Sequence, residues 1–245
     1  MLKKLYDKSK IWFAIVWIVA YCVLMSVGDG LSDAIGVKKS VTLAIAVALS
    51  ALLLIFLKKN GLFKAYGLCR SKTTARTMLF YMPIFIMLSA NLWYGLTFNY
   101  GVLESALYIL AMFCVGFLEE VIFRGLLFEA MREDNVKTAV IVSSVTFGIG
   151  HIINLVNGSG AELIPNLLQV MYATAAGFMF VMIYYKTKSL LLCIAAHGIF
   201  NALSVFANQA NATEKMRMLT AVLLTVITGG YALYIALMEK RKSED

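Results

Sequence analysis

The sequence predicts an all-α fold: a polytopic membrane helix bundle with about eight transmembrane helices. Two observations of composition support this class, since 61% of the 245 residues are hydrophobic and only 15% are charged. A soluble domain is about half apolar and a quarter charged. In addition, the apolar residues form long runs separated by short polar stretches, and a helix needs about 20 of them to cross a bilayer. We therefore expect a single membrane domain over residues 1–245, with no separate soluble domain.

Eight apolar runs define the expected spans. They cover residues 11–27, 40–57, 77–96, 105–131, 138–156, 165–185, 189–207 and 218–238. A polar loop, 28–39, joins the first two runs. Pro83 predicts a kink in the third run, and Pro165 suits the first turn of the sixth. The connection 58–76 carries six Lys or Arg residues. Such a segment is typical of a basic connector at the membrane interface, and substrate binding is the alternative.

The distribution of basic residues predicts the orientation of the bundle. Loops on the side of the two termini carry 17 Lys or Arg residues, and the alternate loops carry four. Because cytoplasmic loops are enriched in Lys and Arg, both termini are expected in the cytoplasm. The same enrichment explains the net charge of +8 without nucleic acid as a partner. The four cysteines have neither a metal-ligand spacing nor the pattern of a disulfide framework.

Two adjacent carboxylates and an arginine lie inside the apolar run 105–131. Ionisable groups at membrane depth are costly and mark a functional site by default. Glu120 and Arg124 are four residues apart, so they share a helix face and can form an ion pair of purely structural importance. Glu119 points about 100° away, where its own helix offers no counter-charge. We therefore expect another helix to compensate Glu119, or Glu119 to be protonated.

Both histidines of the chain, His151 and His197, also fall within spans. A membrane histidine often serves only as a hydrogen-bonding residue between helices. The placement of both histidines of the chain within spans nevertheless favours a functional role. Counted from the cytoplasmic ends, Glu119, His151 and His197 lie roughly 20, 21 and 12 Å along their helices, so they can converge. Asn201 shares a face with His197, and Phe147 shares one with His151, against whose imidazole we expect it to pack.

Glycines flank both histidines and are expected to let neighbouring helices approach closely. These are Gly148, Gly150 and Gly198. The converging side chains offer what water activation needs: a general base, a group that orients it, and donors for an oxyanion. They also match a zinc site of Glu119, His151 and His197 with one open position. The HExxH pattern of soluble zinc proteases is absent.

Three short motifs, in order on three of the expected spans, resemble those of a known family. They are Glu119-Glu120-x-x-x-Arg124, Phe147-x-x-x-His151 and His197-x-x-x-Asn201. In this order they resemble the CPBP (Abi) family, which comprises type II CAAX prenyl endopeptidases and bacteriocin-processing enzymes. The similarity covers about residues 117–201, and a catalytic core is expected at about 104–208.

The resemblance implies an intramembrane endopeptidase. By motif position, Glu119 and His151 would activate the water, and His197 and Asn201 would stabilise the tetrahedral oxyanion. Such enzymes have been described both as metal-dependent and as metal-free. We favour the mechanism that requires no cofactor, because Asn201 suits an oxyanion donor better than a zinc ligand, and zinc is the alternative. Glu120, Arg124 and Phe147 would support this architecture.

The expected substrate is a membrane-associated or hydrophobic peptide, such as a bacteriocin or signal-peptide precursor. A prenylated CAAX protein is the runner-up, because the short loops are typical of a bacterial plasma-membrane protein. A non-catalytic immunity or scaffold protein is a second class of function. A proton-coupled transporter is a third, since buried Glu and His residues form proton relays. No inverted repeat of the kind found in transporters is detectable in the sequence.

Overall fold

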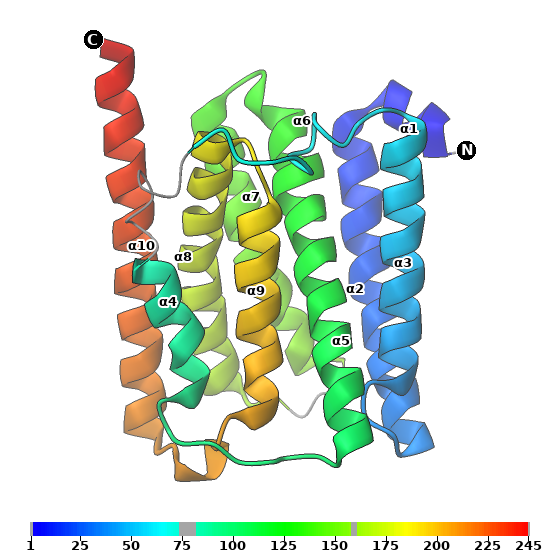
Figure 1. The fold of residues 1–245 in the computed structure, drawn as a ribbon, viewed down its shortest axis with the longest axis vertical. Helices are drawn as coiled ribbons and strands as arrows, with labels where there is room; N and C mark the ends of the chain where they lie inside the picture. The colour runs from blue at the N-terminus through cyan, green and yellow to red at the C-terminus, as the bar shows by residue number, and fades with distance from the viewer. Residues whose placement is uncertain (1, 74–81, 158–160, 245) are drawn as a thin grey trace.

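The computed structural model describes residues 2–73, 82–157 and 161–244. Within these ranges the protein is helical, and its β pairing amounts to an isolated bridge between Leu96 and Ala207. The long helices stand side by side, and the chain termini lie at the same end of the bundle (Figure 1). We call this end the terminal face and the other end the opposite face. The predicted all-α bundle is confirmed.

Six helices of the described chain are long and apolar enough to cross a membrane. They are α2 (Lys10–Ile35), α3 (Ser40–Lys59), α5 (Val102–Glu119) with its continuations η3 and α6, α7 (Val136–Gly150) with η4 (His151–Leu155), α8 (Leu163–Thr187) and α10 (Glu214–Glu244). Two shorter apolar helices are α4 (Met82–Ser89), continued by η2 (Ala90–Leu92), and α9 (Leu191–Leu203), continued by η5 (Ser204–Phe206). Together they correspond to the eight predicted spans, although the start of the third, 77–81, lies outside the described residues.

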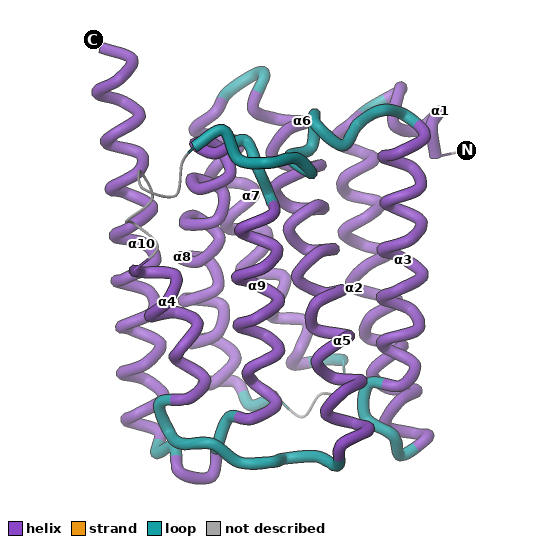
Figure 2. The backbone as a smooth tube through the Cα atoms, in the orientation of Figure 1, coloured by secondary structure: helices purple, strands orange, loops and turns teal. Residues whose placement is uncertain are grey.

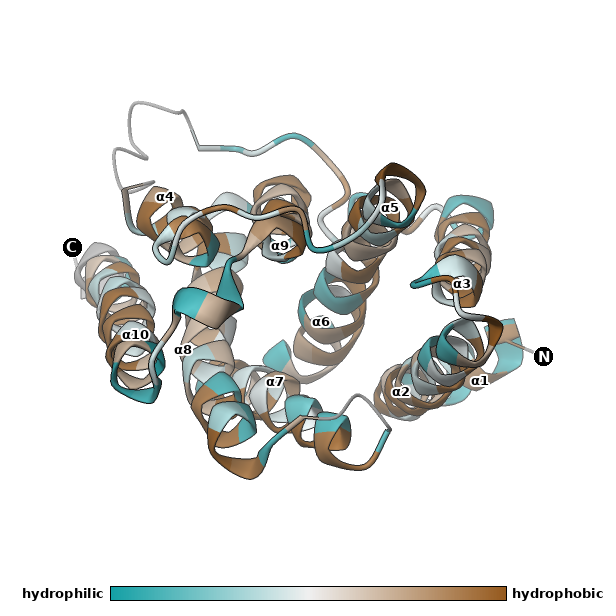
Figure 3. Ribbon diagram, turned by 90° about the horizontal axis from the view of Figure 1, so that it is seen from below, coloured by the Kyte–Doolittle hydropathy of each residue, from teal (hydrophilic) through white to brown (hydrophobic). Residues whose placement is uncertain are grey.

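The connections gather at the two ends of the bundle (Figure 2). Two further short elements, α1 (Leu2–Lys8) and η6 (Gln209–Asn211), belong to these ends. Seen from the opposite face, the helices carry hydrophobic residues over most of their length (Figure 3). Large apolar side chains such as Val19, Leu52 and Leu110 are exposed on the outside of the bundle. In a membrane protein such side chains face lipid.

The first predicted loop begins later than expected. The sequence predicts a loop from Gly28, but α2 continues to Ile35 and ends at Gly36, whose φ is +79°. The extra turns are polar on the side that packs against α3, where a Cβ on Gly28 would lie 3.0 Å from the Cα of Thr42. The polar residues at this end of α2 therefore include some that contact α3, and they do not mark the start of a loop.

The helix that carries the paired carboxylates changes its winding at the site. After Glu119, α5 passes into a π-helical segment, η3 (Glu120–Phe128), and then into α6 (Glu129–Arg132). Every residue of η3 is buried. π-helical turns inside longer helices are rare and occur frequently at functional sites.

The basic connection after α3 closes the terminal face. Its described part, residues 60–73, crosses this end of the bundle, and we call it the capping segment (Figure 1). The Leu190 amide donates to the carbonyl oxygen of Gly67 at 2.8 Å, and the Ser189 hydroxyl donates to that of Cys69 at 2.6 Å. The capping segment is therefore fastened to the turn between α8 and α9.

Candidate active site

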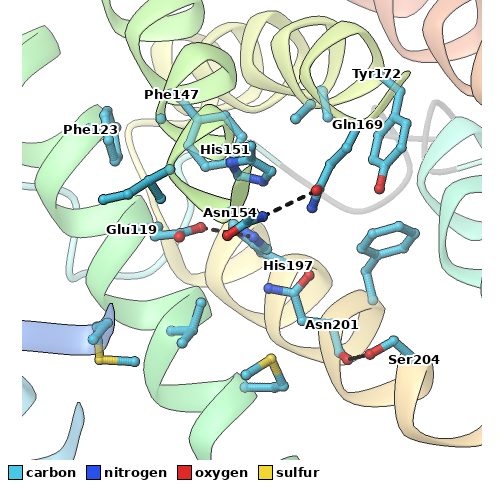
Figure 4. Close-up of a pocket in the computed structure, with 18 of the residues that line it drawn as sticks. Glu119, Phe123, Phe147, His151, Asn154, Gln169, Tyr172, His197, Asn201 and Ser204 are labelled. Atoms are coloured by element: carbon cyan, nitrogen blue, oxygen red, sulfur yellow. Dashed lines mark hydrogen bonds and ion pairs between the residues drawn. The ribbon is translucent and has the colours of Figure 1, made fainter. Parts of the chain in front are cut away.

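A cavity of about 350 Å³ lies inside the bundle. Helices α2, α5, α8 and α9 contribute to its walls, together with the end of α7. All four residues predicted to be catalytic line it: Glu119, His151, His197 and Asn201. Figure 4 shows these side chains around the same space. The structure thus brings together groups from three spans that the sequence separates by up to 82 residues.

The imidazole of His197 lies between the paired carboxylates. Its Nδ1 is 2.8 Å from Oε1 of Glu120, and its Nε2 is 3.3 Å from Oε2 of Glu119. The ring stacks on Phe180, with the centroids 5.7 Å apart, and meets the edge of Phe147 at 5.6 Å. Two aromatic contacts and two polar contacts therefore fix the orientation of this ring.

Glu120 and Arg124 form the ion pair that their spacing predicts. Nη1 of Arg124 lies 3.1 Å from Oε1 of Glu120, and both side chains are fully buried. The guanidinium group also sits over the ring of Phe147, 4.1 Å from its centroid. Because the same Glu120 oxygen contacts His197, this pair is a buried support for the imidazole.

Glu119 obtains its partners from two other helices. The hydroxyl of Tyr21, on α2, donates to Oε1 of Glu119 at 2.6 Å, while His197, on α9, faces Oε2. The Glu119 residue is 9% exposed, so it borders the cavity. Sequence analysis did not identify Tyr21. The available signal was a phenol hydroxyl in the middle of an apolar span, because such a group requires a polar partner there.

His151 occupies the point where α7 tightens into the 3₁₀ helix η4. Its ring meets the edge of Phe147 with the centroids 5.4 Å apart, as their spacing predicts. The side-chain amide of Asn166 donates to the backbone oxygen of His151 at 2.9 Å. In Figure 4 the imidazole lies at the cavity wall close to Glu119 and His197.

Amide and hydroxyl groups extend the polar wall beyond the predicted residues. Asn201 follows His197 by one turn of α9 and points into the cavity (Figure 4). Asn154 donates to Oε1 of Gln169 at 3.2 Å, and Asn157 donates to Oδ1 of Asn154 at 3.4 Å. The amides of Asn154, Asn157 and Gln169 were not predicted, because a single polar residue near the end of a span resembles an ordinary loop residue.

The donor set fits a zinc ion only in part. Two ligands of a tetrahedral zinc, each about 2.0–2.1 Å from the metal, lie roughly 3.3 Å apart. The separation of 3.3 Å between His197 Nε2 and Glu119 Oε2 meets this requirement. Over the described residues, however, no three His, Cys, Asp or Glu side chains are grouped as metal ligands, so His151 does not complete the set.

Comparisons with known proteins find similarity in the part of the chain that carries this site. Residues 101–203 match the family described as type II CAAX prenyl endopeptidase Rce1-like. The curated relative "Putative membrane peptidase YdiL" of Bacillus subtilis is 36% identical over 89 residues, which are 36% of this chain and 31% of that protein. The match therefore spans about a third of the length of this relative. No solved structure matches the chain significantly.

These matches confirm the resemblance to the CPBP family that the three motifs indicate. All seven residues of the motifs lie inside the matched range, whereas Tyr21 lies outside it. The apolar helices and the two matches together identify a multi-pass membrane protein of bacterial type.

Proposed function

We propose that the chain, which resembles the CPBP family of membrane proteases, is an intramembrane endopeptidase that hydrolyses a membrane-associated or hydrophobic peptide. A bacteriocin or signal-peptide precursor is the substrate class we favour. The observation that carries the proposal is the environment of Glu119. This carboxylate borders a cavity, lies beside two imidazoles, and has both oxygens oriented by groups from other helices.

In the proposed reaction, Glu119 and His151 hold a water molecule against the scissile carbonyl carbon. Glu119 accepts a proton from the water as its oxygen attacks, and it later passes this proton to the leaving amine. The side-chain amide of Asn201 donates to the oxyanion of the tetrahedral intermediate. No covalent bond between enzyme and substrate is required.

His197 supplies the second oxyanion donor in this scheme. Its Nδ1 makes the short contact, 2.8 Å, to Glu120, which is itself paired with Arg124. The contact from Nε2 to Glu119 is 3.3 Å, longer than the usual N–H···O hydrogen bond. With a proton on each ring nitrogen, Nε2 can donate to a developing oxyanion, while the contact of Nδ1 with Glu120 prevents the ring from turning away.

We propose that the reaction proceeds without a metal. The two carboxylate contacts of His197 support this mechanism, because they give both ring nitrogens a role in which no metal takes part. Zinc at Glu119, His151 and His197 is the alternative. If it binds there, it supplies a Lewis acid for the carbonyl and a more acidic water.

The experiment compares peptides from cells that produce the wild-type protein or the Glu119→Gln variant. The substitution keeps the size of the side chain and removes the base. We expect a truncated peptide to disappear in the variant, and its sequence then names the substrate. Glu133→Gln is the matched control, since this side chain is 75% exposed and remote from the cavity.

The outcome also separates the competing functions. If the product that disappears in the variant ends at a prenylated cysteine, the CAAX alternative is supported. The only specific support for this alternative so far is the name of the matched family. Identical peptide profiles combined with an unchanged cellular phenotype of the variant would favour the immunity or scaffold function. Ion flux in liposomes that depends on Glu119 without proteolysis would favour a transporter.

A further inference from the structure

The cavity reaches the opposite face of the bundle. From Glu119, in the middle of its long helix, its walls continue to the residues where several helices begin or end. At that end they include Asp29, Lys39, Tyr108, Asn157, Gln169 and Ser204. The helix ends that carry these residues gather at the lower end of the bundle in Figure 1, the end viewed in Figure 3.

Toward the terminal face the same space is filled. Directly beyond Glu119 lie Glu120 and Arg124, and the next turn of this helix adds Phe128, all three fully buried. Leu190 is also fully buried, and its amide is bonded to the capping segment. A substrate therefore has no open path to Glu119 through this layer of side chains.

Basic residues distinguish the two faces. Among the described residues, the loops and helix ends of the terminal face hold 16 Lys and Arg residues, and those of the opposite face hold four. This asymmetry orients the terminal face toward the cytoplasm. Building on the proposed protease function, we propose that the substrate enters the active site from the extracytoplasmic face, so that the enzyme cleaves an exported peptide or the external end of a membrane-inserted one.

The walls of the cavity indicate what form this peptide takes. Apolar surface comes from Met25, Met87, Met112 and Phe200. Polar surface comes from the amides of Asn154, Asn157, Gln169 and Asn201, and an amide can both donate and accept hydrogen bonds. An extended backbone at membrane depth needs such partners, because water is scarce there. The occupant is therefore an extended segment with apolar side chains.

The mouth of the cavity, which is its end at the opposite face of the bundle, carries little net charge. Nζ of Lys39 lies 2.7 Å from Asp29 Oδ1 and over the ring of Tyr108, 5.6 Å from its centroid. The opposite charges of this pair offset each other beside the entrance. An uncharged stretch of peptide passes such a rim without losing an ion pair, which agrees with the apolar wall beyond it.

Cysteine labelling in cells tests the direction of entry. In a background with the four natural cysteines replaced by alanine, Asn157→Cys places a thiol at the mouth and Glu133→Cys places one on the terminal face. The probe is a sulfonated fluorescent maleimide that does not cross membranes. We expect intact cells to label the Asn157→Cys variant at least tenfold faster than the Glu133→Cys variant, and permeabilised cells to label both.

A second readout links the mouth to cleavage. Labelling the Asn157→Cys variant in intact cells should reduce release of the product peptide at least tenfold, because the attached probe fills the entrance. Labelling of this variant only after permeabilisation would overturn the proposal, and so would full cleavage after complete labelling. If the wild-type protein releases no product at all, the protease function fails, while the labelling rates still decide the orientation of the mouth.

Discussion

Glu119 is the residue on which the account of the site depends. A carboxylate on an apolar span acts as a base only if neighbouring groups hold it toward the substrate. Tyr21 and His197 do this from two other helices, each contacting a different oxygen of Glu119. Tyr21 is a positioning residue in this scheme, since its hydroxyl acts on the substrate only through Glu119.

Removing the Tyr21 hydroxyl tests this role. Tyr21→Phe leaves the ring in place and frees one oxygen of Glu119. We therefore expect kcat to fall roughly 10- to 100-fold, where each factor of ten corresponds to an increase of about 1.4 kcal/mol in the activation free energy. The KM should change little, because the hydroxyl does not contact substrate. Steady-state kinetics of the purified protein measure both values. Tyr66→Phe is the matched control, because it removes a hydrogen bond to Tyr6 outside the cavity. Equal losses in the two variants would assign Tyr21 a merely structural role.

Arg124 acts on stability first and on activity second. Arg124→Met leaves the carboxylate of Glu120 buried without its cation, which costs about 3–5 kcal/mol in comparable buried pairs. Thermal unfolding in detergent should show a large decrease of Tm. Arg132→Met removes a partly exposed pair with Glu129 and should cost about 0–1 kcal/mol. Similar decreases for both variants would show that the buried pair contributes little.

At the scale of elements, the helices meet through glycines. A Cβ on Gly116 of α5 would lie 2.7 Å from the backbone nitrogen of Gly198 on α9, and one on Gly148 would lie 2.8 Å from the Cα of Thr174 on α8. The close approach predicted for Gly148 and Gly198 is therefore confirmed. The same prediction was wrong for Gly150, whose added Cβ would meet no atom within 4 Å.

The contact of α5 with α9 sets the position of His197 relative to Glu119. Gly116→Ala forces these backbones apart, so we expect a loss of about 1–3 kcal/mol in stability and a clear decrease in kcat. Gly230→Ala is the control on α10, where an added methyl meets nothing within 4 Å. Thermal unfolding and the cleavage rate report the two effects. A Gly116→Ala variant as stable and active as the control would contradict the proposed geometry.

The sequence anticipates the helices better than their local winding. Long apolar runs define the spans, because lipid tolerates few alternatives to a helix. By contrast, nothing in residues 120–128 signals that the helix widens into π turns, since that geometry depends on packing around Glu120 and Arg124. The end of α2 was misplaced for a related reason, because Asp29 and Ser32 make hydrogen bonds with Thr42 of α3.

At the scale of the whole molecule, the motif residues were predictable and their surroundings were not. Glu119, His151, His197 and Asn201 stand out because polar groups are rare within apolar runs. Tyr21 is 98 residues from Glu119, and single-sequence patterns do not report pairs so far apart. The amides at the mouth likewise gain their meaning only from the cavity that they line.

Chelation tests the requirement for a metal in the intact protein. Incubation of the purified enzyme with 1,10-phenanthroline, followed by its removal, should leave the cleavage rate within a factor of two. Loss of activity that returns on addition of zinc, but not of calcium, would instead assign Glu119, His151 and His197 as ligands. The non-chelating 1,7-isomer of the compound controls for effects on the membrane protein itself.

The role of Glu119 as general base is tested by the cleavage rate of the purified protein with and without its carboxylate. The peptide identified in cells serves as substrate, and Glu119→Gln is compared with the wild type at equal folded concentration. We predict a decrease of about 10²–10⁴-fold, the range expected for loss of a general base. A Glu119→Gln variant that cleaves within threefold of the wild-type rate would show that Glu119 is not the general base.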